Sequence, residues 1–501
     1  MHTSLMSPED WAREEFGGAA LGDRRRARRL VRVAGRVAAS PGGTLCSALP
    51  DWAELHAAYR LMNGPAVTHG KVLADHFRRT RERCAALPEG LECLLIEDTT
   101  AADFTAHRDA EGLGRIGDDG GRGFYVHTTL AAVMREHEEG GAATGEVAAT
   151  AELVGLFDQR WWARGDKPPG GGAAGERKAS RLSRARESQR WAACLSECPP
   201  ACLSGEAPPP GPGRWTFVAD REGDVYEVLS RCRELGVAPL IRACQDRALC
   251  GEGAGPHAGP HAGPPGHLFA AVRAAPVKGT YELRLRARPG QAARMARVQV
   301  RSAAVTLRPP WRPAGFGRDL GPVEVNVIEA WEPDPPEGAE PLHWVLLTTW
   351  PADTLAQCRR AVRAYGLRFL IEDFHKALKT GCGLEKSQLA TAQALAALLG
   401  VLSLVAARLL DLKLMARARP DEPVTADRVG PEPLAVLGHR FGEPAGGWTH
   451  RTTLRAVARL GGFLARKGDG EPGWITIWRG WKRLNDLCEG YAIALAMAKS
   501  H

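Results

Sequence analysis

The sequence predicts an α/β protein in which a mixed (α+β) sheet carries helical segments before and after it along the chain. Apolar runs typical of buried strands recur between residues 89 and 349, and two of them end in carboxylates. Before residue 88 and after residue 350 the apolar residues follow helical spacing instead. With 501 residues, the chain is long enough for several domains with ample cores.

Composition favours a polyanionic partner without identifying it, because a formal charge of +8 is a small excess over this length. Residues 1–16 carry acids and no apolar core segment, so we expect no signal peptide and a cytoplasmic protein. The 12 cysteines are then expected to be reduced. The apolar run 394–407 is too short for a membrane span, which predicts a buried helix and no membrane segment.

Three helices are predicted near the N-terminus, and the first is strongly basic. Asp23 can cap a helix whose arginines lie on its surface, while Leu30 and its apolar neighbours face inward. A second helix is predicted at 52–62 and a third from about residue 67. Such a unit suits DNA binding, although a solvated cationic helix would give the same pattern. The surface arginines are Arg24, Arg25, Arg28, Arg32 and Arg36.

Carboxylates follow two of the predicted strands. The run 91–100 (LECLLIEDTT) contains Glu97 and Asp98, whose side chains must point to opposite faces of a strand, so only one can serve a given site. Strands at 123–134 and 150–157 follow and predict a meander. The run RWTFVAD ends in Asp220 and continues into a helix. An acid at a strand end can hold a metal, and a surface turn is the alternative.

The segment 237–349 has five β-like stretches joined by proline-rich loops and looks inserted. His257 and His261, in its low-complexity loop, are expected to be solvated. A helix is predicted near 177–198, between glycine- and proline-rich loops. The cysteines there are unlike a zinc site, because no CxxC pair supports them. They are Cys194, Cys198 and Cys202.

The stretch 365–379 (YGLRFLIEDFHKALK) predicts an amphipathic helix. At about 100° per residue its polar side chains fall on one narrow stripe, opposite an apolar face. One carboxylate among cations and a phenol suits a metal ion beside a phosphodiester. A solvated face with a Glu372–Lys376 pair is the alternative. The stripe consists of Tyr365, Arg368, Glu372, Lys376 and Lys379.

Two strand-end aspartates and a late helical glutamate resemble the DDE triad of cut-and-paste transposases. The spacing of Tyr365, Arg368, Glu372 and Lys379 is similar to the Y-R-E-K signature of the insertion-sequence-four transposase family, which includes the transposase of the kanamycin-resistance composite transposon. Further runs resemble that family around the triad and at both ends of the chain. They are IEDTT, VADREGD, IEDFHKALKTG, ALGDRRRARRLV, AAYRLMN and LGGFLARKGDGEPGW.

The resemblance implies a ribonuclease-H-like catalytic core with an inserted β-rich subdomain, flanked by helical domains. It places a DNA-binding domain at 1–88, the catalytic domain at 89–395 with 237–349 inserted, and a dimerisation domain at 396–501. The glycine- and proline-rich loop before Asp220 and the GPHAGPHAGPPG loop depart from the family only in the length of connections.

Residue by residue, the resemblance assigns Asp98, Asp220 and Glu372 to two divalent metals, Mg²⁺ with Mn²⁺ able to substitute. Asp98 is preferred to Glu97 because it occupies the family's aspartate position. Tyr365, Arg368 and Lys379 would bind phosphates at the transposon end, with help from Lys376. Trp344 occupies the position of an aromatic near a displaced base, although a core tryptophan is the alternative, and Phe369 that of a second aromatic.

The implied function is DNA transposition. The protein would bind the terminal inverted repeats as a homodimer on double-stranded DNA, nick to free a 3′ hydroxyl, pass through a hairpin and join the element to target DNA. Two rivals stay open at this stage. One is a ribonuclease-H-like nuclease that cuts without joining, and the other is a domesticated DNA-binding regulator without catalysis.

Overall fold

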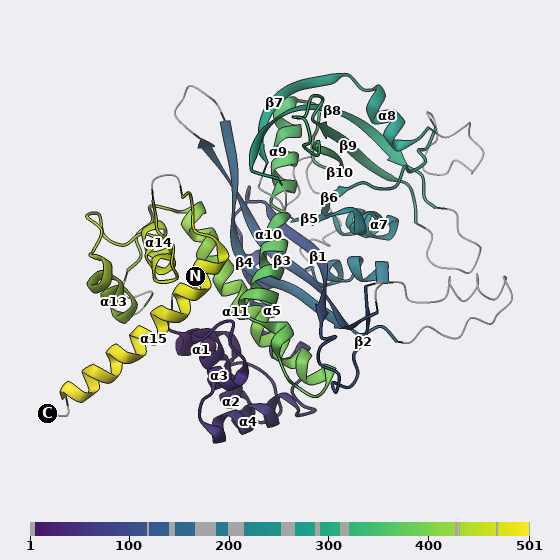
Figure 1. Ribbon diagram of the computed structural model, residues 1–501. Coiled ribbons are helices and arrows are strands. Elements are labelled where there is room, and N and C mark those ends of the chain that lie inside the picture. Colours follow the sequence, from purple (N-terminus) through teal and green to yellow (C-terminus); the bar gives the residue numbers. More distant parts are fainter. Residues whose placement is uncertain are drawn as a thin grey trace.

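The computed structural model describes residues 6–117, 120–139, 146–165, 187–198, 215–251, 266–285, 291–310, 320–425, 429, 431–466 and 469–499. One large mixed sheet runs through the molecule and helices pack around it (Figure 1), so the predicted α/β class is confirmed. The loop predicted at 205–213 lies outside the described residues, as does Cys202. Residues 252–265 of the GEGAGPHAGPHAGPPG loop, with His257 and His261, also lie outside them.

The ten strands are β1 (Cys93–Asp103), β2 (Gly114–Ile116), β3 (Gly121–Glu139), β4 (Glu146–Trp162), β5 (Trp215–Ala219), β6 (Ala238–Arg242), β7 (Val277–Leu285), β8 (Arg294–Leu307), β9 (Val323–Trp331) and β10 (His343–Thr348). Their order is β2-β3-β1-β5-β6-β10-β9-β8-β7, and β4 pairs with β3.

Strand direction changes within the sheet. β1, β3 and β4 are antiparallel neighbours, which confirms the predicted meander. β5 runs parallel to β1, and β6 runs parallel to β5. These three strands therefore end at the same edge of the sheet. The segment 237–349 adds β10, β9, β8 and β7 to this sheet beyond β6. The predicted domain boundaries themselves stay predictions.

The N-terminal helices are α1 (Pro8–Phe16), α2 (Arg24–Ala39), α3 (Leu45–Ala48), α4 (Trp52–Met62) and α5 (His69–Ala85). Asp23 caps α2, because its side chain accepts a hydrogen bond from the Arg25 N–H. The predicted cap and the helix at 52–62 are confirmed. The prediction omitted α1 and α3, which are short and begin at Ser7 and Thr44 caps.

The later helices are α7 (Tyr226–Leu235), α8 (Leu268–Ala274), α9 (Leu355–Gly366), α10 (Phe369–Lys376), α11 (Ala392–Ala418), α13 (Pro431–Phe441), α14 (His450–Leu460) and α15 (Trp474–Lys499). The described part of the helix predicted at 177–198 is not α-helical. It forms two 3₁₀ segments, η1 (Glu187–Ala192) and η2 (Cys194–Glu197), which pack against α7 just before two prolines.

Helix α11 forms the centre of the core beside the sheet. It is long and apolar enough to cross a membrane by length and composition, but its apolar window is entirely buried inside the protein. It packs against β4, α5 and α14 and so joins the two helical ends of the chain to the sheet. A helix that is apolar all round needs such complete burial, as the sequence predicted for this run.

Candidate functional site

Asp98 lies in the middle of β1, two residues beyond the last pair that β1 forms with β5, with 17% of its side chain exposed. The expectation that Asp98 stands at a strand end is wrong, because β1 continues beside β3 as far as Asp103. Its Oδ1 accepts a hydrogen bond of 2.8 Å from the Thr99 N–H. Strand β5 pairs with β1 in the register Ile96 to Val218, so Asp98 and Asp220 come level two residues further on. Two separate parallel strands thus deliver their carboxylates side by side.

Glu97 points to the opposite face of β1, as strand alternation requires. Its carboxylate is fully buried and accepts a 2.7 Å hydrogen bond from the Thr129 hydroxyl, and its Oε2 lies 3.1 Å from Nε2 of His127. These contacts hold Glu97 in the core behind the sheet. Glu97 therefore cannot share a site with Asp98.

Asp220 directly follows β5. Its Oδ1 accepts a hydrogen bond of 2.8 Å from the Glu222 N–H and so begins a short 3₁₀ turn, η4 (Arg221–Gly223). The helix after it starts only at Tyr226, later than the sequence predicted. Asp224 explains the delay, because its buried carboxylate binds the N–H groups of Cys244 and Gln245 and holds the chain out of the helix.

The helix predicted at 365–379 is broken, and this prediction is wrong. Helix α9 ends at Gly366, and α10 begins at Phe369 after a turn with i to i−3 hydrogen bonds through Leu367 and Arg368. A π-helical segment, η5 (Ala377–Gly381), follows α10. The tighter turn and the wider segment change the angle per residue, so the polar residues do not form one stripe.

Arg368 stands between two of the predicted acids. Its Nη2 donates to Oε1 of Glu372 at 2.5 Å, and its Nη1 lies 3.8 Å from Oδ2 of Asp98. Arg368 is buried, whereas half of the Glu372 side chain is exposed. The guanidinium also lies over the ring of Phe369 at 4.9 Å. One buried cation thus links the β1 carboxylate to the α10 carboxylate.

The pKa of Asp98 is raised to about 7, chiefly by burial and next by the nearby Asp220, while Arg368 and the Thr99 N–H oppose the shift. Glu372 also raises it. Since carboxylates disturb one another's pKa only at short range, the three predicted acids belong to one electrostatic site. A carboxyl with a raised pKa beside two further acids is a frequent mark of a functional site.

The donor chemistry of these residues fits a hard divalent cation, because every candidate ligand is a carboxylate oxygen. Within the described ranges, however, no three His, Cys, Asp or Glu side chains are already arranged around one point as metal ligands. Arg368 makes the contacts with Asp98 and Glu372 instead. A bound cation would have to take over the charge compensation that this guanidinium supplies.

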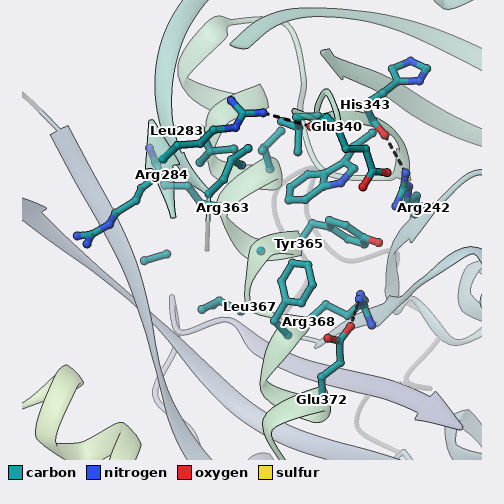
Figure 2. Close-up of a pocket in the computed structure, with 18 of the residues that line it drawn as sticks. Arg242, Leu283, Arg284, Glu340, His343, Arg363, Tyr365, Leu367, Arg368 and Glu372 are labelled. Atoms are coloured by element: carbon teal, nitrogen blue, oxygen red, sulfur yellow. Dashed lines mark hydrogen bonds and ion pairs between the residues drawn. The ribbon is translucent and has the colours of Figure 1, made fainter. Parts of the chain in front are cut away.

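A pocket of about 900 Å³ opens beside Arg368 and Glu372. Figure 2 shows Tyr365 in its middle, with Arg363 and Arg284 on one side and Arg242 on the other. Cations outnumber acids in the lining, and aromatic side chains stand among them. The charged and aromatic lining residues are Arg221, Arg242, Tyr281, Glu282, Arg284, Arg294, Glu340, His343, Trp344, Arg359, Arg363, Tyr365, Arg368, Phe369, Glu372, Asp373 and Lys376.

Tyr365 and Trp344 are buried in the wall of this pocket, at 2% and 6% exposure. Their rings meet edge to face, with centroids 4.9 Å apart. The expectation that Tyr365 lies on an exposed stripe is therefore wrong, because its ring packs on Trp344 of β10. Trp344 belongs to the core cluster and lines the pocket at the same time.

The predicted lysines differ in their surroundings. Lys376 is exposed and lines the pocket. Lys379 is not among the lining residues, because its Nζ donates to the Ala101 carbonyl at 2.8 Å and pairs with Glu385 at 3.0 Å. The π-helical segment that carries Lys379 directs it back to β1. The pocket as it stands thus gathers Lys376 but not Lys379.

The surface arginines of α2 lie elsewhere in the molecule. Arg25, Arg28 and Arg32 are exposed and do not line the pocket. Arg32 pairs with Glu54 of α4 at 3.0 Å, so Arg25 and Arg28 are the more available cations on this helix. The structure therefore has a basic helical surface apart from the pocket.

Sequence reasoning missed several pocket cations, notably Arg242, Arg359 and Arg363. Arg242 is the last residue of β6, just as Asp220 comes directly after β5. Its position at the end of a predicted strand was the sequence signal that could have identified it. Its Nη2 donates to the His343 carbonyl at 2.9 Å. Arg359 and Arg363 lie on α9, before Tyr365, the first residue of the Y-R-E-K signature. The sequence alone did not mark them as pocket residues, because their role depends on the strand that faces them.

The comparisons with known protein families match both ends of the chain. Residues 8–67 match the model described as Transposase DNA-binding. Residues 447–500 match the model described as Transposase Tn5 dimerisation domain. The two matches support a transposase of the Tn5 type.

The matched segments correspond to distinct parts of the fold. The DNA-binding match covers α1 to α4, including the exposed arginines of α2, and supports the predicted DNA partner. The dimerisation match covers α14 and α15, inside the C-terminal region predicted to form a dimer. The sheet and the acidic site lie between the two matches.

Proposed function

We propose that this protein is a cut-and-paste DNA transposase of the insertion-sequence-four family, with Asp98, Asp220 and Glu372 as its DDE triad. The observation that carries the proposal is the position of Arg368 between Asp98 and Glu372, in a register of β1 and β5 that brings Asp220 level with Asp98. The effect of both other acids on the pKa of Asp98 supports it. The strand order β4-β3-β1-β5-β6, with β3 antiparallel, supports a ribonuclease-H-like core. The two transposase matches support the function from outside the site.

Asp98, Asp220 and Glu372 would hold Mg²⁺, with Mn²⁺ able to substitute. When bound, paired metal ions generate a nucleophilic oxygen near neutral pH and neutralise the leaving oxygen of a phosphodiester. The raised pKa of Asp98 supports this assignment, because a carboxyl crowded by two others gains most from a divalent cation. Asp98 must lose its proton before it can act as a ligand.

The cations and aromatics of the pocket would bind the transposon end. Arg368 offers a planar fork for a phosphate, and Lys376 a mobile point charge. Tyr365 would position Arg368 from the buried side, and Lys379 would join the phosphate contacts after release from Glu385. Trp344 and Phe369 line the pocket and would stack on a displaced base.

The reaction we propose begins with binding of terminal inverted repeats by the α2 surface, through Arg25, Arg28 and Arg32. Cleavage then frees a 3′ hydroxyl. This hydroxyl attacks the opposite strand, which closes a hairpin at the element's end and releases the flanking DNA. Water then opens the hairpin, and the 3′ hydroxyl that is freed again joins the element to target DNA. Two subunits would pair on DNA through the C-terminal helices. We place the protein in the bacterial cytosol, at the nucleoid when bound to DNA.

The test is cleavage of a duplex that carries one end of the element encoding the protein. Wild-type protein should cut it only with Mg²⁺ or Mn²⁺, and Glu372→Gln should bind it without cutting. Arg273→Gln, at an exposed residue of α8 outside the pocket and outside both family matches, is a control that should cut normally. Full activity of Glu372→Gln would refute the site. A strand-transfer assay separates a transposase from a nuclease that does not join DNA.

A further inference from the structure

Beyond Tyr365 the pocket continues between α9 and β7, where three donor groups lie without a hydrogen-bond partner among the residues that the structure describes. They are the Tyr281 hydroxyl and the Nε atoms of Arg359 and Arg363. All three side chains line the pocket. Since buried polar atoms in folded proteins are nearly always paired, three unpaired donors at one wall indicate a missing acceptor.

The three groups form one cluster. Arg359 and Arg363 lie one turn apart on α9 and so share a face of the helix. The Arg359 guanidinium lies over the ring of Tyr281, 4.9 Å from its centroid. Tyr281 is 9% exposed and its hydroxyl is enclosed, so a ligand in the pocket would reach it through a shift of the side chains that line the pocket. Two helical cations and one strand phenol thus face the same space.

The cluster has little negative charge to balance it. Arg363 pairs with Glu136 at 3.7 Å, and no ion pair of Arg359 occurs in the described parts of the chain. Burial lowers the pKa of Arg363, and the neighbouring Arg359 also lowers it, although Glu136 acts in the opposite sense. Burial raises the pKa of Tyr281, so the phenol stays a neutral donor. An anion would satisfy the donors and the charge together.

We propose that Arg359, Arg363 and Tyr281 form a second phosphate site, which binds a DNA backbone phosphate next to the one that Arg368 contacts. The proposal rests on the proposed function for the identity of the ligand. A phosphodiester fits because its oxygens only accept hydrogen bonds, and guanidinium groups match its geometry. The continuous pocket lets one strand reach both sites. Figure 2 shows Arg363 facing the pocket from the side opposite Arg242.

Binding of a fluorescent duplex that carries one element end, measured without divalent metal over a range of salt concentrations, tests the site. Arg363→Gln should raise the dissociation constant about 10-fold and reduce the slope of log K against log salt by about 0.9, the value for one phosphate contact. Tyr281→Phe should raise it about 5-fold. The melting temperature of Tyr281→Phe should not fall, because the Tyr281 hydroxyl has no hydrogen-bond partner among the described residues of the free protein.

The matched control is Arg273→Gln, which removes the same charge from an exposed residue of α8 that lies 3.8 Å from Glu329 and outside the pocket. It should leave the salt slope unchanged. Single methylphosphonates, each of which removes the charge of one phosphate, are placed in turn along the DNA end. At one position the substitution should weaken binding by the wild-type protein about 10-fold. At that position it should not weaken binding by Arg363→Gln any further. That coupling would locate the phosphate.

Normal binding by Tyr281→Phe, or a scan without any coupled position, would overturn the proposal and leave water as the partner of these donors. Cleavage with Mg²⁺ is measured on the same preparations. If the protein cleaves DNA but no methylphosphonate position is coupled to Arg363, the second phosphate site alone is refuted. If one methylphosphonate position is coupled to Arg363 but the protein does not cleave DNA, the phosphate site stands and the proposed function is refuted instead.

Discussion

The indole Nε1 of Trp474 donates a 2.9 Å hydrogen bond to Oδ1 of Asp373, the residue that follows Glu372. Oδ2 of Asp373 accepts a second bond, of 2.9 Å, from Nζ of the buried Lys413. The Lys413 ammonium lies 4.3 Å from the Trp474 ring centroid. The first turn of α15, the long helix within the dimerisation match, is thereby fixed to the helix that carries the candidate catalytic glutamate.

Replacing Asp373 should therefore disturb both stability and catalysis. Asp373→Ala leaves Lys413 buried without this partner, which should lower the free energy of unfolding by about 3 kcal/mol. Urea unfolding followed by tryptophan fluorescence measures the loss. Cleavage should fall more than DNA binding, because α10 loses its anchor. Asp373→Asn keeps the hydrogen bond from Trp474 and should lose less, and equal losses for both variants would contradict this account.

The raised pKa of Asp98 predicts how stability changes with pH in the absence of metal. Its folded pKa of about 7 lies above the ordinary aspartate pKa of 3.8. The protonated group thus contributes stability that is fully present below about pH 4 and is lost as pH rises through 7. The loss should be about 3 kcal/mol, seen as a falling melting temperature between pH 5 and 8.

Glu92 complicates this measurement, because burial raises its pKa to about 7 as well. The difference between wild type and Asp98→Asn isolates the contribution of Asp98. Added Mg²⁺ should stabilise wild type above pH 7 and not Asp98→Asn, since only the carboxylate binds the cation. The same pH slope in both proteins would show that Asp98 is not the group with the raised pKa.

The neighbouring acids Glu97 and Asp98 should behave oppositely on substitution. Glu97→Gln keeps the shape of the side chain in its buried network with His127 and Thr129. Glu97→Gln should lower the free energy of unfolding by about 1 to 3 kcal/mol. The fraction of Glu97→Gln that is folded should still cut DNA. Asp98→Asn should fold normally and not cut. Stability by thermal melting and cleavage by gel assay, on both variants together, distinguish the two faces of β1.

The last turns of α15 project away from the rest of the molecule (Figure 1) and carry exposed apolar side chains. Ile493 and Met497, one turn apart, are 56% and 62% exposed. This face lies in the dimerisation match, so we expect it to pair two subunits on DNA. Light scattering after gel filtration should show the Ile493→Glu, Met497→Glu double variant bound to single DNA ends as a monomer. Arg483→Gln, on the same helix before this face, is the control, and a paired complex of the double variant would refute the assignment.

Much of the fold was predictable because its signals are local. Alternating apolar runs gave all strands of the segment 237–349 within a few residues, and Asp23 gave the start of α2. The break between α9 and α10 was not predictable from periodicity. The residues around Gly366 have an acceptable helical pattern, and the turn at Leu367 and Arg368 lies beside the contact between Tyr365 and Trp344, which only the tertiary structure shows.

The sequence by itself determined that Glu97 and Asp98 face apart, that Asp220 follows a strand, and that a helix begins at the Asp23 cap. These follow from strand alternation and capping, which depend on neighbours in the chain. Only the tertiary structure decided that Arg368 lies between Asp98 and Glu372, and that Tyr281 meets Arg359. Those contacts join elements separated by many residues, and they depend on how the sheet orders its strands and how α9 and α10 pack across it.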